Sequence, residues 1–191
     1  MEIGIIGIGT LTLELARRAA AAGFRVVINN PRGNSLVHDA VLKMSSNIHL
    51  GSLDEAAAAD IILLFIPKEN LETVLKNLPD MTGKIIVHTS CLIFNPHTLL
   101  SSISNALTYQ ITASLLPSAH VIKLFNPVRL EAAILNQYEK RDEIYFIADH
   151  AQSKDSLKMF LKKLNFQPID LSGRLRLHRS VINLEARINP N

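Results

Sequence analysis

The strongest constraint on the fold lies in the first 33 residues, where an apolar run, two closely spaced glycines, an alanine-rich segment and a second apolar run follow one another. Residues 3–8 are almost wholly apolar, as is typical of a strand buried on both faces of a sheet. The glycines make the turn that follows, and residues 12–22 favour a helix. Residues 24–28 are expected to form the second strand. This order predicts a βαβ unit of the kind that binds dinucleotides.

The glycine-rich turn is expected to hold a pyrophosphate. Gly7 allows the tight turn, and Gly9 lets phosphates approach the backbone where a helix N-terminus offers unpaired N–H groups. Thr12 stands where glycine or alanine is usual, so a larger side chain must fit where helix and strand pack closely. An ordinary tight turn is the alternative, but the flanking strands favour dinucleotide binding. The expected cradle consists of Gly7, Ile8, Gly9, Thr10 and Leu11, which act mainly through backbone N–H groups.

The end of the second strand indicates which dinucleotide binds. Sites that prefer NAD carry Asp or Glu there to bind the ribose hydroxyls, whereas residues 29–35 contain no acid. Arg32 can pair with the 2′-phosphate of NADP and stack on adenine. Asn30 and Ser35 can donate hydrogen bonds to the same phosphate. The alternative is a solvated loop arginine, but the turn upstream leads us to predict NADP as the cofactor.

The rest of the chain predicts an α/β fold. Apolar and helix-favouring segments alternate through five strands, which calls for a parallel sheet with helices on both faces. We expect helices at residues 35–44 and 130–137 and a loop at residues 89–96. We therefore predict a single doubly wound, Rossmann-type domain over residues 1–191, with a mostly parallel sheet of about eight strands. A short C-terminal extension begins at about residue 174 and ends at residue 191.

Ligands of open α/β sheets lie outside the carboxyl ends of the strands. Phe65, Ile66 and Pro67 lie at the carboxyl end of the most apolar predicted strand, residues 60–66. We expect them to contact the ribose and nicotinamide part of the cofactor.

A second wall of the site is expected near the next two strands, and its side chains are candidates for substrate binding. His88, Thr89 and Ser90 follow the fifth strand. Lys123 can face an anionic group, and Asn126 can hydrogen-bond a carboxamide or carbonyl. A buried, satisfied histidine, a strand-edge lysine and a turn-forming asparagine are the alternatives. No residue is assigned a catalytic role.

Composition excludes several classes of protein. The chain is 48% hydrophobic and 19% charged, with a net charge of +3 spread along it, so we expect an ordered domain and no nucleic-acid partner. No apolar run approaches the ~20 residues of a membrane span, and no Cys or His spacing indicates a metal site. One cysteine and an N-terminus that begins directly with a strand predict a soluble, cytoplasmic protein.

Several segments together carry a family resemblance. They are residues 6–9, 23–28, 30–33, 35–36, 56–60, 66–67, 82–87, 121–126 and 165–170. In this order the chain resembles, over nearly its whole length, the short bacterial form of the NADP-dependent oxidoreductases that reduce a deazaflavin coenzyme. That family shares its N-terminal signature with pyrroline-5-carboxylate reductases and with the cytosolic domain of membrane ferric reductases.

The resemblance implies hydride transfer between NADP(H) and a planar, deazaflavin- or flavin-like small-molecule acceptor. It also implies cofactor contacts at residues 8–11, Asn30, Arg32 and Ser35, with the nicotinamide near residues 66–67 and Leu124. Thr12, Pro31 and residues 88–91 depart from the family pattern. A reductase of a small imine or carbonyl, with a proton donor among residues 88–90, and a non-catalytic dinucleotide-binding protein remain alternatives. A homodimer is the default assembly for such domains.

Overall fold

The computed structural model describes residues 1–93, 107–126 and 142–173. Its strands are β1 (Glu2–Ile6), β2 (Arg25–Asn29), β3 (Ile48–Leu50), β4 (Ile61–Leu64), β5 (Ile85–Ile93), β6 (His120–Asn126), β7 (Asp142–Ala148) and β8 (Phe166–Asp170). Its α-helices are α1 (Thr10–Ala21), α2 (His38–Leu42), α3 (Leu53–Ala57), α4 (Lys68–Lys76), α6 (Leu107–Leu115) and α7 (Ala151–Lys163), and a 3₁₀ turn, η1, covers Asn34–Leu36.

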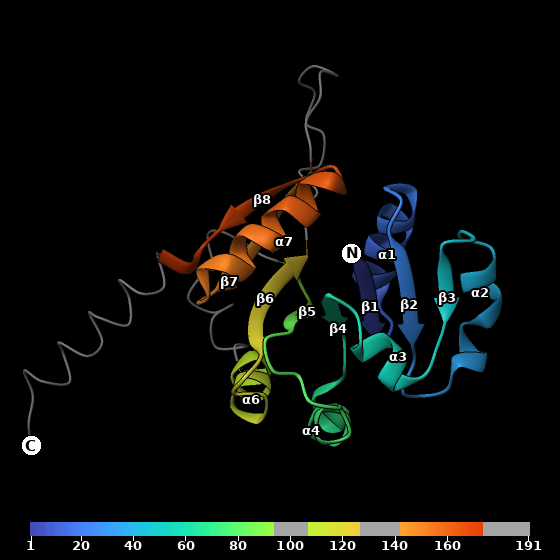
Figure 1. The fold of residues 1–191 in the computed structure, drawn as a ribbon, viewed down its shortest axis with the longest axis horizontal. Coiled ribbons are helices and arrows are strands. Elements are labelled where there is room, and N and C mark those ends of the chain that lie inside the picture. Colours follow the sequence, from blue (N-terminus) through green and yellow to red (C-terminus); the bar gives the residue numbers. More distant parts are fainter. Residues whose placement is uncertain (94–106, 127–141, 174–191) are drawn as a thin grey trace, which may run out of the picture.

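The strands form one eight-stranded sheet in the order β3-β2-β1-β4-β5-β6-β7-β8 (Figure 1). Neighbours from β3 to β6 pair in parallel, β7 runs antiparallel to β6, and β8 is parallel to β7. The chain reverses direction across the sheet between β1 and β4, which creates the switch point where such folds bind ligands. The predicted Rossmann-type, mostly parallel fold is confirmed.

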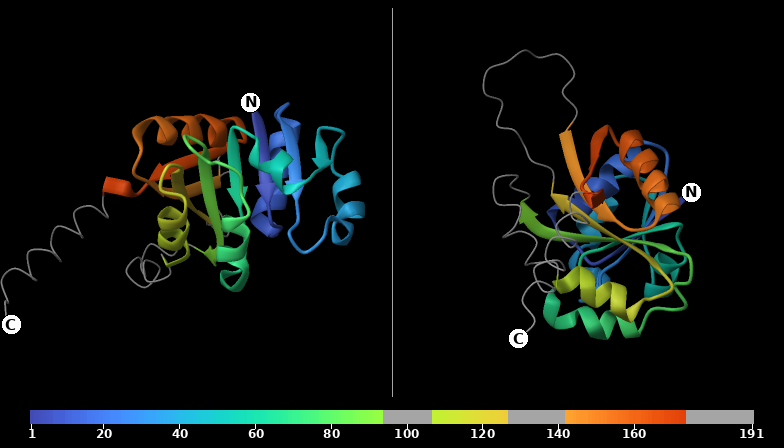
Figure 2. Two further views of the ribbon diagram at one scale, coloured as in Figure 1. Left: turned by 60° about the horizontal axis from the view of Figure 1, so that its bottom comes forward. Right: turned by 90° about the vertical axis from the view of Figure 1, so that its left-hand side faces the viewer.

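Helices cover both faces of the sheet, because every central strand is apolar on both sides. All four residues of β4 are buried. One core lies between the sheet and helices α1 and α7 and includes Leu15 and Phe160. The other lies under α3, α4 and α6 and includes Leu64 and Leu71. Figure 2 shows α1 and α7 on one side of the sheet and α4 and α6 on the other.

Two sequence predictions differ from the structure. The loop predicted at residues 89–96 is wrong over residues 89–93, where β5 continues because Thr89 and Ile93 pair with β6. The single helix predicted at residues 35–44 is divided into η1 and the short α2. The helix predicted at residues 130–137 and the extension at residues 174–191 lie outside the described residues. Among the residues that the structure describes, no helix is both long and apolar enough to traverse a lipid bilayer.

Candidate dinucleotide-binding site

The turn between β1 and α1 tolerates only glycine at its first position. Gly7 has a φ of +85°, a conformation that side chains rarely adopt. A Cβ atom at Gly7 would lie 1.9 Å from the carbonyl oxygen of Phe65. At Gly9 it would lie 2.6 Å from Cε1 of the Phe65 ring. The turn is therefore bare backbone packed against the segment that follows β4.

Thr12 fits the close contact between helix and strand, although its side chain is larger than the glycine or alanine expected there. The residue is fully buried. Its Oγ1 accepts a hydrogen bond from the Gly9 N–H at 2.9 Å and donates one to the Gly9 carbonyl at 3.0 Å. The next N–H groups, those of Thr10 and Leu11, lie in the first turn of α1, where a helix offers its donors no partner. This turn carries no acidic residue, so nothing in it repels an anion.

Side-chain amides hold the loop after β2. Asn34 Oδ1 accepts from the Asn30 N–H at 2.8 Å, and Asn34 Nδ2 donates to the Gly51 carbonyl at 2.9 Å. The Asn30 amide donates to the Gly33 carbonyl at 3.0 Å, and its oxygen accepts from the Arg32 N–H at 3.3 Å. The Asn30 side chain is thus engaged within the loop, while Arg32 is exposed.

A pocket of about 80 Å³ brings the ends of β1, β2 and β4 together. Its lining residues are Gly7, Ile8, Asn30, Pro31, Arg32, Phe65, Ile66, Pro67 and Asn70. Most of these were predicted from the sequence. Asn70 was missed, because the helix-favouring pattern around it gives no sign that the first turn of α4 reaches the pocket.

Other predicted cofactor contacts lie outside this pocket. Gly9, Thr10 and Leu11 belong to the adjoining turn and start of α1, and Ser35 is exposed in η1. The Leu124 side chain is fully buried and packs in the core beneath α1 and α7.

The strands predicted to form the second wall of the site contain a buried pair of basic side chains. His88 on β5 and Lys123 on β6 are register partners, are 2% and 4% exposed, and bring Nδ1 and Nζ to 3.4 Å. Lys123 can act only as the donor, so we assign the imidazole proton to Nε2. That atom is buried and has no hydrogen-bond partner among the described residues.

Burial, together with the positive charge of Lys123, lowers the pKa of His88 to about 3, so the imidazole is neutral near pH 7.

The other residues predicted to bind substrate lie on the same two strands. The Thr89 hydroxyl donates to the Leu64 carbonyl at 3.1 Å. Ser90 lies on β5 and Asn126 ends β6.

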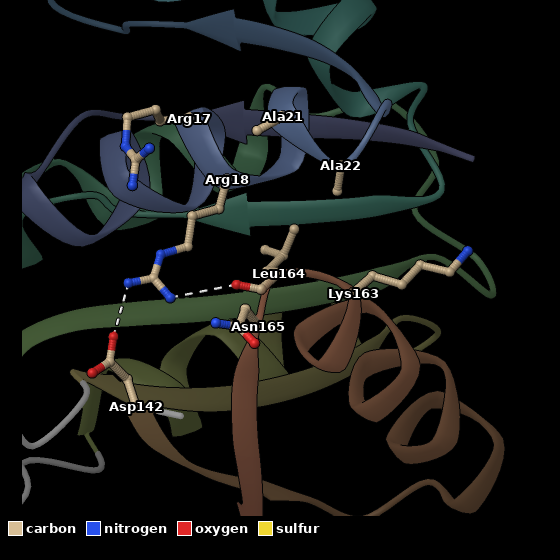
Figure 3. A pocket seen from close by; sticks show the side chains of 8 residues that line it. All are labelled: Arg17, Arg18, Ala21, Ala22, Asp142, Lys163, Leu164 and Asn165. Atoms are coloured by element: carbon tan, nitrogen blue, oxygen red, sulfur yellow. Dashed lines mark hydrogen bonds and ion pairs between the residues drawn. The ribbon is translucent and has the colours of Figure 1, made fainter. Parts of the chain in front are cut away.

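A larger hollow of about 410 Å³ lies between α1 and α7, away from the glycine turn (Figure 3). Arg18 crosses it, donating to Asp142 at 2.8 Å and to the Leu164 carbonyl at 3.4 Å, and also to Glu14 at 2.7 Å. Arg17 is likewise bonded to Glu14, and mainly this bond lowers the pKa of that carboxyl to about 2. Because both arginines are paired with carboxylates, we interpret the hollow as a structural contact that joins α1 to β7 and to the end of α7.

The observed residues fit a dinucleotide that carries a 2′-phosphate. The glycine backbone leaves room beside the start of α1, and the loop after β2 offers Arg32 where an NAD site would hold an acid. Both features face one pocket at the switch point of the sheet.

Comparison with known proteins identifies relatives of the chain. Residues 2–91 match the sequence model of the family described as "NADP oxidoreductase coenzyme F420-dependent". The chain is 28% identical to human metalloreductase STEAP2, with 98% of this chain and 36% of that protein aligned. The chain therefore spans little more than a third of the length of the curated relatives it matches.

Solved structures share the fold. A hypothetical protein from Sinorhizobium meliloti superimposes with a TM-score of 0.72 at 26% identity, covering 90% of this chain and 85% of that one. A candidate F420-dependent NADP reductase from Arthrobacter gives 0.62 at 18%, covering 98% and 93%. An imine reductase from Aspergillus terreus in complex with NADPH4 gives 0.64 at 15%, covering 97% and 62%.

These matches agree with the family that the sequence resembles. The resemblance is confirmed: residues 2–91 are related to the coenzyme F420-dependent NADP oxidoreductases, and the enzyme class and cofactor predicted for the chain are those of this family.

Proposed function

We propose that this chain is an NADP(H)-dependent oxidoreductase domain that transfers hydride between the nicotinamide and a planar deazaflavin- or flavin-like acceptor. One observation carries the cofactor assignment. The glycine turn after β1 and Arg32 on the acid-free loop after β2 line the same pocket. That combination provides for both the pyrophosphate and the 2′-phosphate of NADP.

Each part of the site has a distinct task in this proposal. The N–H groups of Thr10 and Leu11 receive the pyrophosphate, because a helix N-terminus combines free donors with a positive dipole end. The Arg32 guanidinium pairs with the 2′-phosphate. Residues 65–67 support the ribose and nicotinamide. When bound, NADPH supplies a hydride.

Two observations support a planar acceptor. The matched family is described by its dependence on coenzyme F420, a deazaflavin. Hydride transfer between two stacked rings depends mainly on their positioning. A His88 that stays neutral is compatible with such a reaction, because an imidazolium is not required as an acid.

A reductase of a small imine is the second candidate. The fold matches that of an imine reductase, and the contact between Lys123 and His88 supplies a potential proton donor, which imine reduction needs. The two candidates therefore differ in whether His88 is required for turnover.

The cofactor assignment is tested by titrating the wild-type chain with NADPH and NADH and following nicotinamide fluorescence. We expect NADPH to bind more tightly. Arg32→Gln should weaken NADPH about 10- to 100-fold and leave NADH unchanged, since a charge-assisted hydrogen bond contributes about 1.5–3 kcal/mol. Arg25→Gln is the matched control. Arg25 is also exposed, but it begins β2, whereas Arg32 lies on the loop after the other end of that strand. Equal binding of both dinucleotides would refute the assignment.

The acceptor is tested by mixing NADPH with a deazaflavin, FMN or a cyclic imine under anaerobic conditions and following NADPH absorbance. We expect oxidation by the deazaflavin or by FMN, and we expect His88→Gln to retain it. Turnover confined to the imine and abolished in His88→Gln would favour the second candidate. Stable NADPH binding without oxidation by any acceptor would favour a binding protein.

A further inference from the structure

We propose that Thr12 positions the phosphate-binding backbone at the start of α1. It stands where the third glycine, or an alanine, of the dinucleotide-binding pattern G-x-G-x-x-G usually lies. This inference rests on the proposed NADP site and names a residue that acts through its neighbours. Thr12 itself touches no phosphate here, because its hydroxyl is already bonded to Gly9.

The hydroxyl of Thr12 clamps two successive peptide groups. It accepts from the N–H of Gly9, which belongs to the peptide between Ile8 and Gly9. It donates to the carbonyl of Gly9, which belongs to the peptide between Gly9 and Thr10. Gly9 connects these two planes and has the freest backbone of any residue type. A single buried oxygen therefore removes the freedom that the glycine introduces.

The direction of the Thr10 N–H follows from this clamp. In a planar trans peptide the carbonyl and the N–H point in opposite directions. Fixing the Gly9 carbonyl toward the Thr12 hydroxyl therefore fixes the Thr10 N–H in the opposite direction, away from the helix. The Gly9 carbonyl also accepts the Leu13 N–H at 3.0 Å, so it is held from inside the helix by two donors.

The clamp also decides which donors remain. The Gly9 N–H is occupied by Thr12 and does not point at a ligand. The pyrophosphate therefore depends on the N–H groups of Thr10 and Leu11, whose orientation Thr12 maintains. The Phe65 ring also packs against Gly9, so both Thr12 and Phe65 contact the turn.

The test compares Thr12→Val, which keeps the shape and loses the hydroxyl, with Thr12→Ser, which keeps the hydroxyl. The wild type and both variants are titrated with NADPH and with 2′-AMP, which carries the 2′-phosphate but no pyrophosphate. Losing the neutral hydrogen bonds should weaken NADPH about 3- to 10-fold in Thr12→Val. Thr12→Ser should bind NADPH like the wild type, and 2′-AMP should bind all three proteins equally. Thr12→Ala repeats the measurement if the valine variant does not fold.

The outcomes separate this inference from the proposed function. Wild-type protein that binds no NADPH would refute the NADP site and with it the role of Thr12. Wild-type binding that Thr12→Val matches or exceeds would refute only the role of Thr12. An equal loss of NADPH and 2′-AMP would mean that Thr12 supports the fold in general, which would also overturn the inference.

Discussion

The buried His88 imidazole should make the protein less stable in acid, by an amount that the structure sets. Its pKa is lowered from 6.5 to about 3, chiefly by burial and further by the charge of Lys123. Between these values the unfolded chain binds a proton at His88 that the folded chain does not. Stability is therefore complete above about pH 6.5 and is lost as the pH falls. At about 1.4 kcal/mol per pH unit, the loss from pH 6.5 to pH 5 is about 2 kcal/mol.

Urea unfolding at pH 7.5 and pH 5 measures this loss for the wild type and for His88→Gln. Other groups contribute to the pH dependence of both proteins, so the difference between the two dependences isolates His88. We expect the wild type to lose about 2 kcal/mol more than His88→Gln over this interval. His49→Gln removes an exposed histidine from β3 and should follow the wild type. Identical pH dependence of wild type and His88→Gln would refute the burial argument.

Two further pairs of substitutions, each a test and its control, examine the glycine turn and the contacts of Arg18. Gly7→Ala should cost more than about 2 kcal/mol and abolish NADPH binding, because its Cβ meets the Phe65 carbonyl in addition to the positive-φ strain. Gly23→Ala, at a similar φ with open space around it, should cost only about 1 kcal/mol by thermal unfolding. Arg18→Met should cost about 1–2 kcal/mol, because this partly buried side chain bonds to Glu14 on α1, to Asp142 on β7 and to the Leu164 carbonyl at the end of α7. Arg17→Met, which removes one exposed pair, should stay within about 0.5 kcal/mol in the same assay.

The sequence predicts best where local pattern and tertiary structure agree. The βαβ unit was predicted within two residues at each end, because its strands are apolar and its turn needs glycine. Asn30 and Arg32 were predicted from the missing acid after the second strand, and residues 65–67 from the rule that ligands lie at the carboxyl ends of parallel strands.

Prediction failed where pairing partners decide the outcome. Residues 89–93 have no strong strand pattern of their own, and they extend β5 only because β6 runs beside them. The contact between His88 and Lys123 depends on the register of two strands that are far apart in sequence. The role proposed for Thr12 depends on the placement of one hydroxyl, whereas the sequence shows only a residue larger than the glycine or alanine that is usual there.

The amide-held loop after β2 has a consequence for the evolution of cofactor preference. Among the loop hydrogen bonds described, Arg32 contributes only its backbone N–H, while the side chains of Asn30 and Asn34 maintain the loop conformation. The side chain at position 32 can therefore change without loss of the loop. If Arg32 binds the 2′-phosphate as proposed, a substitution at this position can shift the preference between NADP and NAD while the hydrogen bonds that hold the loop remain.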